Sequence, residues 1–199
     1  MPLKIGITGG IGSGKSTICK VFEILNVPVF GADVHAKRLI NSNPKVKESL
    51  INLFGDGIYK SDGAIDRKKL ANIIFNDDLQ LAKINAIIHP IVRNEFTSWF
   101  EKQNSTYVIH EAAILFESGF YKMMDYTILV SAPIKKRIEW LSKRDGIDEG
   151  LIKQRMTKQW SDAQKRKLAT IEIKNNNIDL IIPQVININK QIKEYGKIW

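Results

Sequence analysis

The sequence contains a single cysteine, Cys19, among its 199 residues. One thiol cannot form an internal disulfide framework, which excludes the disulfide-stabilised secreted class and leads us to expect a reducing, cytoplasmic location. The chain has no run of 18 consecutive apolar residues, so we expect no membrane span and no membrane partner. Because its first residues read as a short strand, we also expect no signal peptide.

Acidic residues are scarce relative to basic ones, with 21 Asp and Glu against 30 Lys and Arg and a net charge of +9. Residues 134–168 hold eleven of the basic residues and five acidic ones, so +6 of the +9 lies in this stretch. A nucleic acid, a membrane surface or a polyanionic small molecule would each suit such a charge. No aromatic platform accompanies it, as a single-strand binder would need. A flap over a triphosphate is favoured, with a merely solvated helical face as the alternative.

The most informative motif is glycine-rich. Residues 9–17 read GGIGSGKST, which fits G-x-x-x-x-G-K-[ST], with an apolar strand pattern before it and a helical pattern after it. Such a loop directs backbone N–H groups at the phosphates of a nucleoside triphosphate. Lys15 would reach the β- and γ-phosphates, and the hydroxyl of Ser16 would bind Mg²⁺. The alternative is a plain glycine-rich turn.

Apolar patterning predicts an α/β protein with a parallel sheet. Strands are expected at 3–8, 27–30, 107–110 and 126–130, since short apolar runs among helical segments are typical of buried parallel strands. The fifth strand is ambiguous: either 179–182 or the pair Glu172-Ile173 could supply it. Helices are expected at 15–25, over the basic stretch from 134 to 168, and at 184–196.

Residues 35–100 have a helical, amphipathic pattern that is too long for one crossover connection. We expect an inserted helical subdomain whose helices are interrupted at Asn43-Pro44, Gly55-Asp56-Gly57, Asp62-Gly63 and His89-Pro90. The fold class expected is therefore a three-layer P-loop NTPase fold with a five-stranded parallel sheet, a helical insertion and a helical lid.

Three observations favour a small-molecule kinase over a GTPase or a motor ATPase. The chain has no guanine-specific N-K-x-D, because Asn189-Lys190-Gln191-Ile192 lacks the acid. The third strand does not end in Asp as in a motor ATPase, but in His110-Glu111. The second strand is followed by Asp33, a carboxylate that could receive the proton of an acceptor hydroxyl. The alternative for Asp33 is the N-cap of a helix beginning at Val34.

Several further motifs resemble the dephospho-CoA kinase family of P-loop kinases. The family's opening T-G-G-I-G-S-G-K-S-T is present whole at 8–17, and its I-x-H-P appears at 87–90. Other matched elements are 31–37 (GADVHAK), 54–55 (FG), 62–70 (DGAIDRKKL), 74–75 (IF), 111–119 (EAAILFESG), 144–145 (RD) and 155–159 (RMTKQ). Lys165, Ala169 and Asn175 have the family's K…A…N spacing. The resemblance extends from residue 3 to about 180.

The sequence departs from the family pattern at four positions: Gly31 and Glu111 each stand where the family has Asp, Lys37 where it has Arg, and Ala113 where it has Pro. Only Asp33 is then left as a candidate general base at the acceptor. Lys37 keeps the positive charge but loses the planar fork of Arg, and Glu111 is one methylene longer than Asp.

The resemblance implies ATP-dependent phosphorylation, with Mg²⁺, of the ribose 3′-hydroxyl of dephospho-CoA to give CoA. It implies catalytic roles for Lys15, Asp33 and Arg144. The residues implied to bind ATP are Gly12, Ser13, Gly14, Lys15, Ser16, Thr17, Arg144, Arg155 and Asn175. Those implied to bind the acceptor are Asp33, Lys37, Arg67, His89 and Glu111. His89 could instead be a helix-end hydrogen-bond partner, and Arg67 could pair with Asp66.

The resemblance also implies one kinase domain with a core of 1–32, 101–135 and 169–199, a CoA-binding subdomain at 33–100 and a lid at 136–168. We expect ATP and dephospho-CoA as partners, no nucleic acid, and either a monomer or a homo-oligomer. The rival functions are another nucleoside- or nucleotide-type kinase, and an ATP-binding regulatory module that acts on RNA.

Overall fold

The structure is a computed structural model that describes residues 1–198, except for the side chains of Phe75 and Asn76. The chain divides into two compact units. One unit consists of Met1–Gly31 and the chain from Gln103 onward, and the other consists of Ala32–Lys102. Among the helices of these described residues, none is long and apolar enough to cross a membrane.

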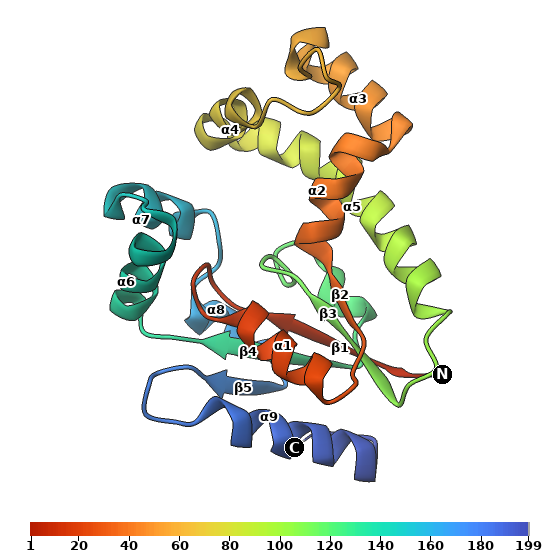
Figure 1. Cartoon of the computed structure of the whole chain (residues 1–199), viewed down its shortest axis with the longest axis vertical. Helices are drawn as coiled ribbons and strands as arrows, with labels where there is room; N and C mark the ends of the chain where they lie inside the picture. The colour runs from red at the N-terminus through yellow and green to blue at the C-terminus, as the bar shows by residue number, and fades with distance from the viewer. Residues whose placement is uncertain (199) are drawn as a thin grey trace. The chain divides into compact units, whose positions relative to one another are not determined.

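The first unit is built on a five-stranded parallel sheet (Figure 1). Its strands are β1 (Leu3–Thr8), β2 (Val29–Gly31), β3 (Tyr107–Glu111), β4 (Tyr126–Ser131) and β5 (Ile171–Lys174), in the spatial order β2-β3-β1-β4-β5. All four strand pairings are parallel. The expected α/β sheet is confirmed. The carboxyl end of β1 leads directly into the glycine-rich loop, so the loop lies at the edge where parallel sheets bind ligands.

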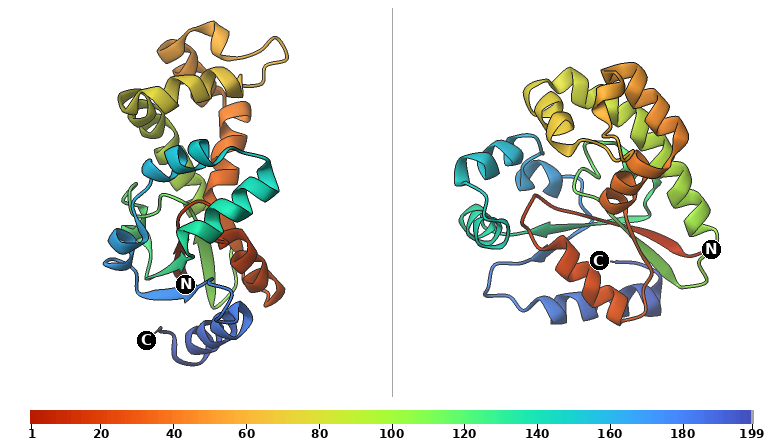
Figure 2. Two further views of the ribbon diagram at one scale, coloured as in Figure 1. Left: turned by 90° about the vertical axis from the view of Figure 1, so that its left-hand side faces the viewer. Right: turned by 45° about the horizontal axis from the view of Figure 1, so that its top comes forward.

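Layers of structure cover both faces of the sheet. On one face α1 (Lys15–Ile24) and α9 (Ile181–Tyr195) lie side by side (Figures 1 and 2). Their apolar residues, among them Phe22 and Val185, join a core with Ile5, Ile7 and other strand residues. The opposite face at Gly6 is so closely covered that a Cβ there would lie 2.6 Å from Leu115 Cδ2. Burial on both faces explains the continuous apolar strand patterns.

The fifth strand is β5, so the Glu172-Ile173 alternative is correct and the strand expected at 179–182 is wrong. Residues from Ile181 onward instead form α9, whose first turn accommodates Pro183 because that turn needs no partner for the missing N–H. Before this helix, Oδ1 of Asn176 accepts hydrogen bonds from the N–H groups of Ile178 and Asp179. That turn keeps the chain between β5 and α9 irregular.

The basic stretch folds into α6 (Ile134–Asp145), α7 (Glu149–Thr157) and α8 (Asp162–Arg166). A short 3₁₀ helix outside this stretch, η2 (Phe120–Met123), precedes β4. α6 packs against α7, and α8 packs against β4. The side chain of Asp148 caps α7, and Ser161 with Gln164 forms a capping box on α8. These caps explain why a stretch so rich in charge still forms defined helices.

The second unit is helical, with α2 (Ala32–Ser42), α3 (Pro44–Phe54), η1 (Asp56–Ile58), α4 (Arg67–Asn76) and α5 (Asp78–Phe100). The side chains of Asn43, Asp66 and Asp77 cap α3, α4 and α5. The expected interruption at His89-Pro90 is wrong, because α5 continues through Pro90. Ile84, Ile88, Val92 and Phe96 are buried on either side of the proline. Their packing outweighs the cost of about 3 kcal/mol for an interior proline.

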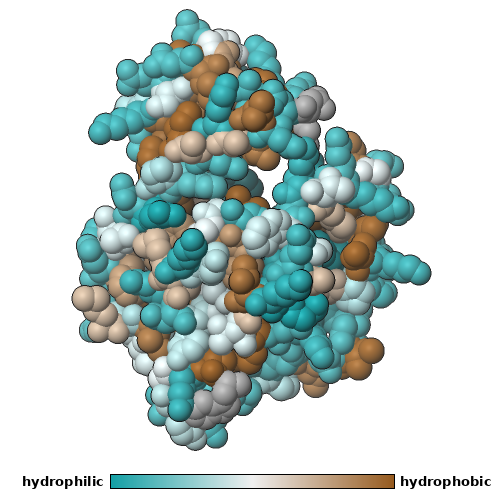
Figure 3. Space-filling view, turned by 180° about the vertical axis from the view of Figure 1, so that it is seen from behind, coloured by the Kyte–Doolittle hydropathy of each residue, from teal (hydrophilic) through white to brown (hydrophobic). Residues whose placement is uncertain are grey.

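The surface drawn in Figure 3 is mostly hydrophilic, and the apolar residues visible on it form separate small groups. Isolated exposed apolar residues of this kind are ordinary for globular proteins.

Candidate functional site: a glycine-rich loop at the end of strand β1

The loop between β1 and α1 is a concave backbone turn with a buried lysine. Gly12 and Gly14 have φ values of 77° and 94°, which side chains rarely adopt. The side chain of Lys15 is folded into the loop, where Nζ donates hydrogen bonds to the carbonyl oxygens of Gly9, at 2.9 Å, and Gly10, at 3.4 Å. Lys15 is only 8% exposed. A positive charge is thus held at the centre of the loop.

The N-terminus of α1 is open to an anion. Gly14 is the N-cap residue and, within the described chain, no side chain caps this end and no acidic residue lies in the first turn. The first N–H groups of a helix have no partner within it, and the helix dipole adds positive potential at the same point. Ser16 and Thr17 follow Lys15 in this turn and are exposed. The arrangement suits the binding of phosphate groups.

Three side chains from distant segments hold the backbone of the loop. The amide of Asn175, after β5, donates to the carbonyl oxygen of Ser13 over 2.9 Å. Nε of Arg137, on α6, donates to the carbonyl oxygen of Ile11 over 2.8 Å. The N–H of Ile11 donates to Oε1 of Gln159, also over 2.8 Å. Asn175 was among the sequence-predicted site residues, whereas Arg137 and Gln159 had no assigned role.

Glu111 ends strand β3 beside the loop. In the register of the sheet it lies opposite Ile7 of β1 and Gly31 of β2. Its charge also acts on the neighbouring thiol: burial raises the pKa of Cys19, the negative charge of Glu111 raises it further, and Lys15 opposes the shift. Cys19 therefore stays a protonated thiol, buried on the side of α1 that faces the core.

The two predicted lid arginines lie around one carboxylate. Arg144 makes two hydrogen bonds to Asp145, Nε to Oδ1 at 2.7 Å and Nη2 to Oδ2 at 2.8 Å. Hydrogen bonding to Arg144 lowers the pKa of Asp145, and the charge of Arg155 on α7 lowers it further. Arg144 is exposed, so its guanidinium can be reached from solvent.

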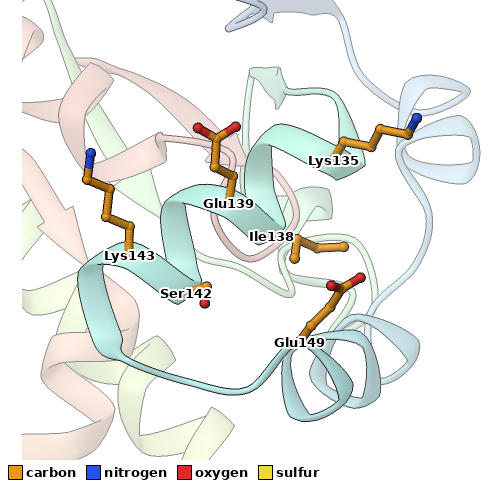
Figure 4. A pocket seen from close by; sticks show the side chains of 6 residues that line it. All are labelled: Lys135, Ile138, Glu139, Ser142, Lys143 and Glu149. Atoms are coloured by element: carbon orange, nitrogen blue, oxygen red, sulfur yellow. The ribbon is translucent and has the colours of Figure 1, made fainter.

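A groove of about 640 Å³ follows α6 and the start of α7 (Figure 4). It is lined by Lys135, Ile138, Glu139, Ser142, Lys143 and Glu149. Its two lysines and two glutamates balance, and its lining includes none of the sequence-predicted site residues. The groove therefore lacks the positive excess expected of a phosphate site.

In the helical unit, Asp33 lies in the first turn of α2, which begins at Ala32. The alternative that it is the N-cap of a helix from Val34 is therefore wrong. The charge of Asp33 acts on His89 of α5: burial lowers the pKa of His89, Arg93 lowers it further, and Asp33 opposes the shift. Lys37 is one turn beyond Asp33 on α2. The helical unit thus brings Asp33, Lys37 and His89 into one region of the α2–α5 pair.

The remaining predicted acceptor residue, Arg67, is the first residue of α4 and is exposed. Asp66, the alternative partner considered for it, uses Oδ1 to accept hydrogen bonds from the N–H groups of Lys68 and Lys69. A cluster that sequence reasoning missed joins α2 and α5: Glu95 lies 3.1 Å from Nδ1 of His35 and also contacts Arg38.

Comparison with known proteins gives a consistent result. A family model described as dephospho-CoA kinase matches residues 3–179. A dephospho-CoA kinase of Porphyromonas gingivalis is 38% identical over 192 residues, with 96% of this chain and 95% of the relative covered. One of Bacteroides fragilis is 35% identical over 189 residues, covering 94% and 92%.

Solved structures agree. A crystal structure of a Thermus thermophilus protein is similar with a TM-score of 0.82 and 30% identity, covering 96% of both chains. A dephospho-CoA kinase of Campylobacter jejuni has a TM-score of 0.71 at 25% identity, covering 99% of this chain and all of the other. A shikimate kinase of Acinetobacter baumannii, with a TM-score of 0.57 and 14% identity, shares the fold.

Proposed function

The chain belongs to the dephospho-CoA kinase family, and from this premise we propose that it transfers the γ-phosphoryl group of ATP to the ribose 3′-hydroxyl of dephospho-CoA, giving CoA and ADP. The observation that carries the proposal is the loop itself. Lys15 is buried at its centre, and the N-terminus of α1 behind it has no capping side chain among the described residues. Such a loop is built for a polyphosphate rather than for a single apolar ligand.

On ATP binding, the ammonium of Lys15 would exchange its hydrogen bonds to the carbonyl oxygens of Gly9 and Gly10 for oxygens of the β- and γ-phosphates. Residues Gly12 to Thr17 would surround the same phosphates and donate to them the backbone N–H groups that are not bonded within the loop. Asn175 supports this role because it fixes the carbonyl of Ser13 and thereby the peptide that precedes Gly14. These contacts position the donor, which is most of what a phosphoryl-transfer enzyme must do.

We include Mg²⁺ in the proposal, with the hydroxyl of Ser16 as its protein ligand. The described residues contain no group of three or more His, Cys, Asp or Glu side chains that could hold a metal ion. This fits Mg²⁺, which commonly takes one or two protein oxygens and completes its shell with phosphate and water. The ion would neutralise charge on the β- and γ-phosphate oxygens when bound.

For the acceptor, we propose that Asp33 receives the proton of the ribose 3′-hydroxyl as the phosphoryl group is transferred. Burial lowers the pKa of His89, so its imidazole is neutral near pH 7. A neutral imidazole can hydrogen bond to the acceptor without forming an ion pair with Asp33. Lys37, Arg67 and Glu111 are proposed to contact the acceptor as well. Lys37 would supply charge to its phosphates as a point cation, without a bidentate contact.

We further propose a kinase core formed by 1–32, 101–135 and 169–199, with 33–100 as the acceptor-binding subdomain and residues 136–168 as a lid. Arg144 would exchange its hydrogen bonds to Asp145 for the transferring phosphates, and Arg155 would contact the same phosphates. Closing a lid excludes water, which strengthens these interactions and prevents hydrolysis of ATP. The reaction is proposed to take place in the cytoplasm.

The test is an acceptor panel with ATP and Mg²⁺, which compares dephospho-CoA with nucleosides, nucleotides and RNA. Among these acceptors, we expect only dephospho-CoA to give rapid formation of ADP. A faster reaction with a nucleotide would overturn the acceptor assignment and favour the rival kinase. Failure of every acceptor, together with salt-dependent RNA binding, would favour the regulatory module instead. A Lys15→Met variant is the control, because it should abolish ADP formation with any true acceptor.

A further inference from the structure

Both peptide groups that flank Ile11 are held by side chains from outside the loop. Its carbonyl oxygen accepts from Arg137, and its N–H donates to Gln159, which lies 148 residues further along the chain. Ile11 stands between Gly10 and Gly12, at the turn of the loop. With both bonds made, neither adjoining peptide can rotate without losing a hydrogen bond, so the conformation of the turn is fixed from outside.

The guanidinium of Arg137 packs directly against Gly10, which has no side chain. A Cβ built on Gly10 would overlap the guanidinium, lying 2.7 Å from Nη1, and the three atoms nearest to it all belong to Arg137. The φ angle of Gly10 is not in the left-handed region, so its backbone would accept alanine. The guanidinium is therefore what requires glycine here. Arg137 is only 6% exposed, and the hydrogen bond from its Nε to the carbonyl oxygen of Ile11 fixes the position of its side chain.

The segment that carries Gln159 is itself anchored. Asp162, three residues later, lies 3.5 Å from Nη1 of Arg137. The N–H of Trp160 donates to Oε1 of Glu117 over 2.9 Å. Lys165, which is fully buried, donates to the carbonyl oxygen of Ala113 over 2.8 Å and lies 3.1 Å from Glu117. The turn after α7 is thus tied to the segment that follows β3, and Gln159 is presented to the loop from a fixed position.

From these contacts we propose that Arg137 and Gln159 are positioning residues for ATP, which act by clamping the two peptides of Ile11. The N–H of Ile11 is committed to Gln159, and the N–H groups of Ser13 and Thr17 donate to carbonyl oxygens of Gly10 and Gly14. The phosphates are therefore left with the N–H groups of Gly12, Gly14, Lys15 and Ser16. The clamp also fixes the end of α7, the helix that carries Arg155. The inference rests on the proposed function in that the ligand of the loop is taken to be ATP.

A double-mutant cycle tests the clamp through Gly10→Ala, Arg137→Met and their combination. Binding of ATP is measured by calorimetry without any acceptor. We expect each single variant to weaken ATP binding about tenfold, the size expected for one buried hydrogen bond. We expect the double variant to be about tenfold weaker as well, because the added Cβ acts only by displacing Arg137. Unchanged binding in the single variants, or about a hundredfold loss in the double, would overturn the proposal.

Gln159→Met provides a second variant at a less buried position, should Arg137→Met fail to fold. It should raise KM for ATP about tenfold while KM for dephospho-CoA and the thermal unfolding temperature stay unchanged. An equal rise in both KM values would point to a general structural role and contradict positioning. Gly57→Ala is the matched glycine control, since its Cβ would meet only Lys69 Nζ at 3.7 Å. The calorimetric titrations contain no acceptor, so they test the clamp even if the acceptor panel overturns the assignment of dephospho-CoA.

Discussion

The side-chain amide of Asn175 donates a hydrogen bond to the carbonyl oxygen of Ser13, with 2.9 Å between Nδ2 and O. The bond joins the end of β5 to the glycine-rich loop across 162 residues of sequence. The same amide lies so close to Gly14 that it occupies the place of a Cβ there. Asn175 is therefore part of the support of the loop as well as a candidate for direct contact with ATP.

Asn175→Ala should weaken ATP binding about three- to tenfold, since one hydrogen bond contributes about 0.5–1.5 kcal/mol. Calorimetric titration with ATP is the measurement. Asn187→Ala, an exposed substitution on α9, is the matched control and should leave the affinity unchanged. If both variants bind ATP as the wild type does, the support role of Asn175 is wrong.

Asp33→Asn should lower kcat by about 10² or more, because a positioned base contributes that much to proton transfer. ATP binding should be retained, since Asp33 belongs to the α2–α5 pair and not to the loop. Steady-state kinetics with dephospho-CoA, combined with ATP titration, separate the two effects. A kcat within a few-fold of the wild type would remove the base role from Asp33.

Lys165→Met should destabilise the protein by about 3–5 kcal/mol, because it leaves the carboxylate of Glu117 without its buried partner. Oε2 of Glu117 is already buried without a hydrogen bond among the described residues. Urea denaturation measures the loss. A second substitution, Glu117→Leu, should recover much of it, because the uncompensated charge is then gone. A single variant as stable as the wild type would show that the pair contributes nothing.

Stability should fall as the pH drops below about 6.5. Burial lowers the pKa of both His35 and His89 in the folded protein from the ordinary value of 6.5. The unfolded chain therefore binds these protons first, and linkage makes folding less favourable as they bind. Urea denaturation between about pH 7.5 and 5.5 should show this decline, and His89→Gln should make it shallower. An equally steep decline in His89→Gln would contradict the assigned shift at this residue.

The sequence predicted the parts of this molecule that local chemistry determines. The loop at 9–17 and the strands at its sides follow from glycine spacing and short apolar runs. Asn43 and Asp66 are good N-caps, so their helix boundaries could also be expected. Expectations were wrong where tertiary packing decides, as at Pro90, where buried residues on both sides keep α5 continuous.

The same distinction explains why Arg137 was missed. In the sequence it is one of eleven basic residues between 134 and 168 and has no distinguishing neighbour. Its role depends on the meeting of α6 with Ile11 and Gly10, which are far away along the chain. Lys165 is similar: its spacing matched the family pattern, but only the fold shows that it is fully buried against Ala113 and Glu117.

The central claim is the transfer of phosphate to one particular hydroxyl, and the most direct measurement follows ³²P from γ-labelled ATP into the products formed with dephospho-CoA. We predict one labelled CoA for each ADP formed, with the label released by a 3′-specific nucleotidase, and no transfer to the 3′-deoxy analogue of dephospho-CoA. Label that appears in inorganic phosphate alone, or that is transferred equally to the 3′-deoxy analogue, would contradict the account.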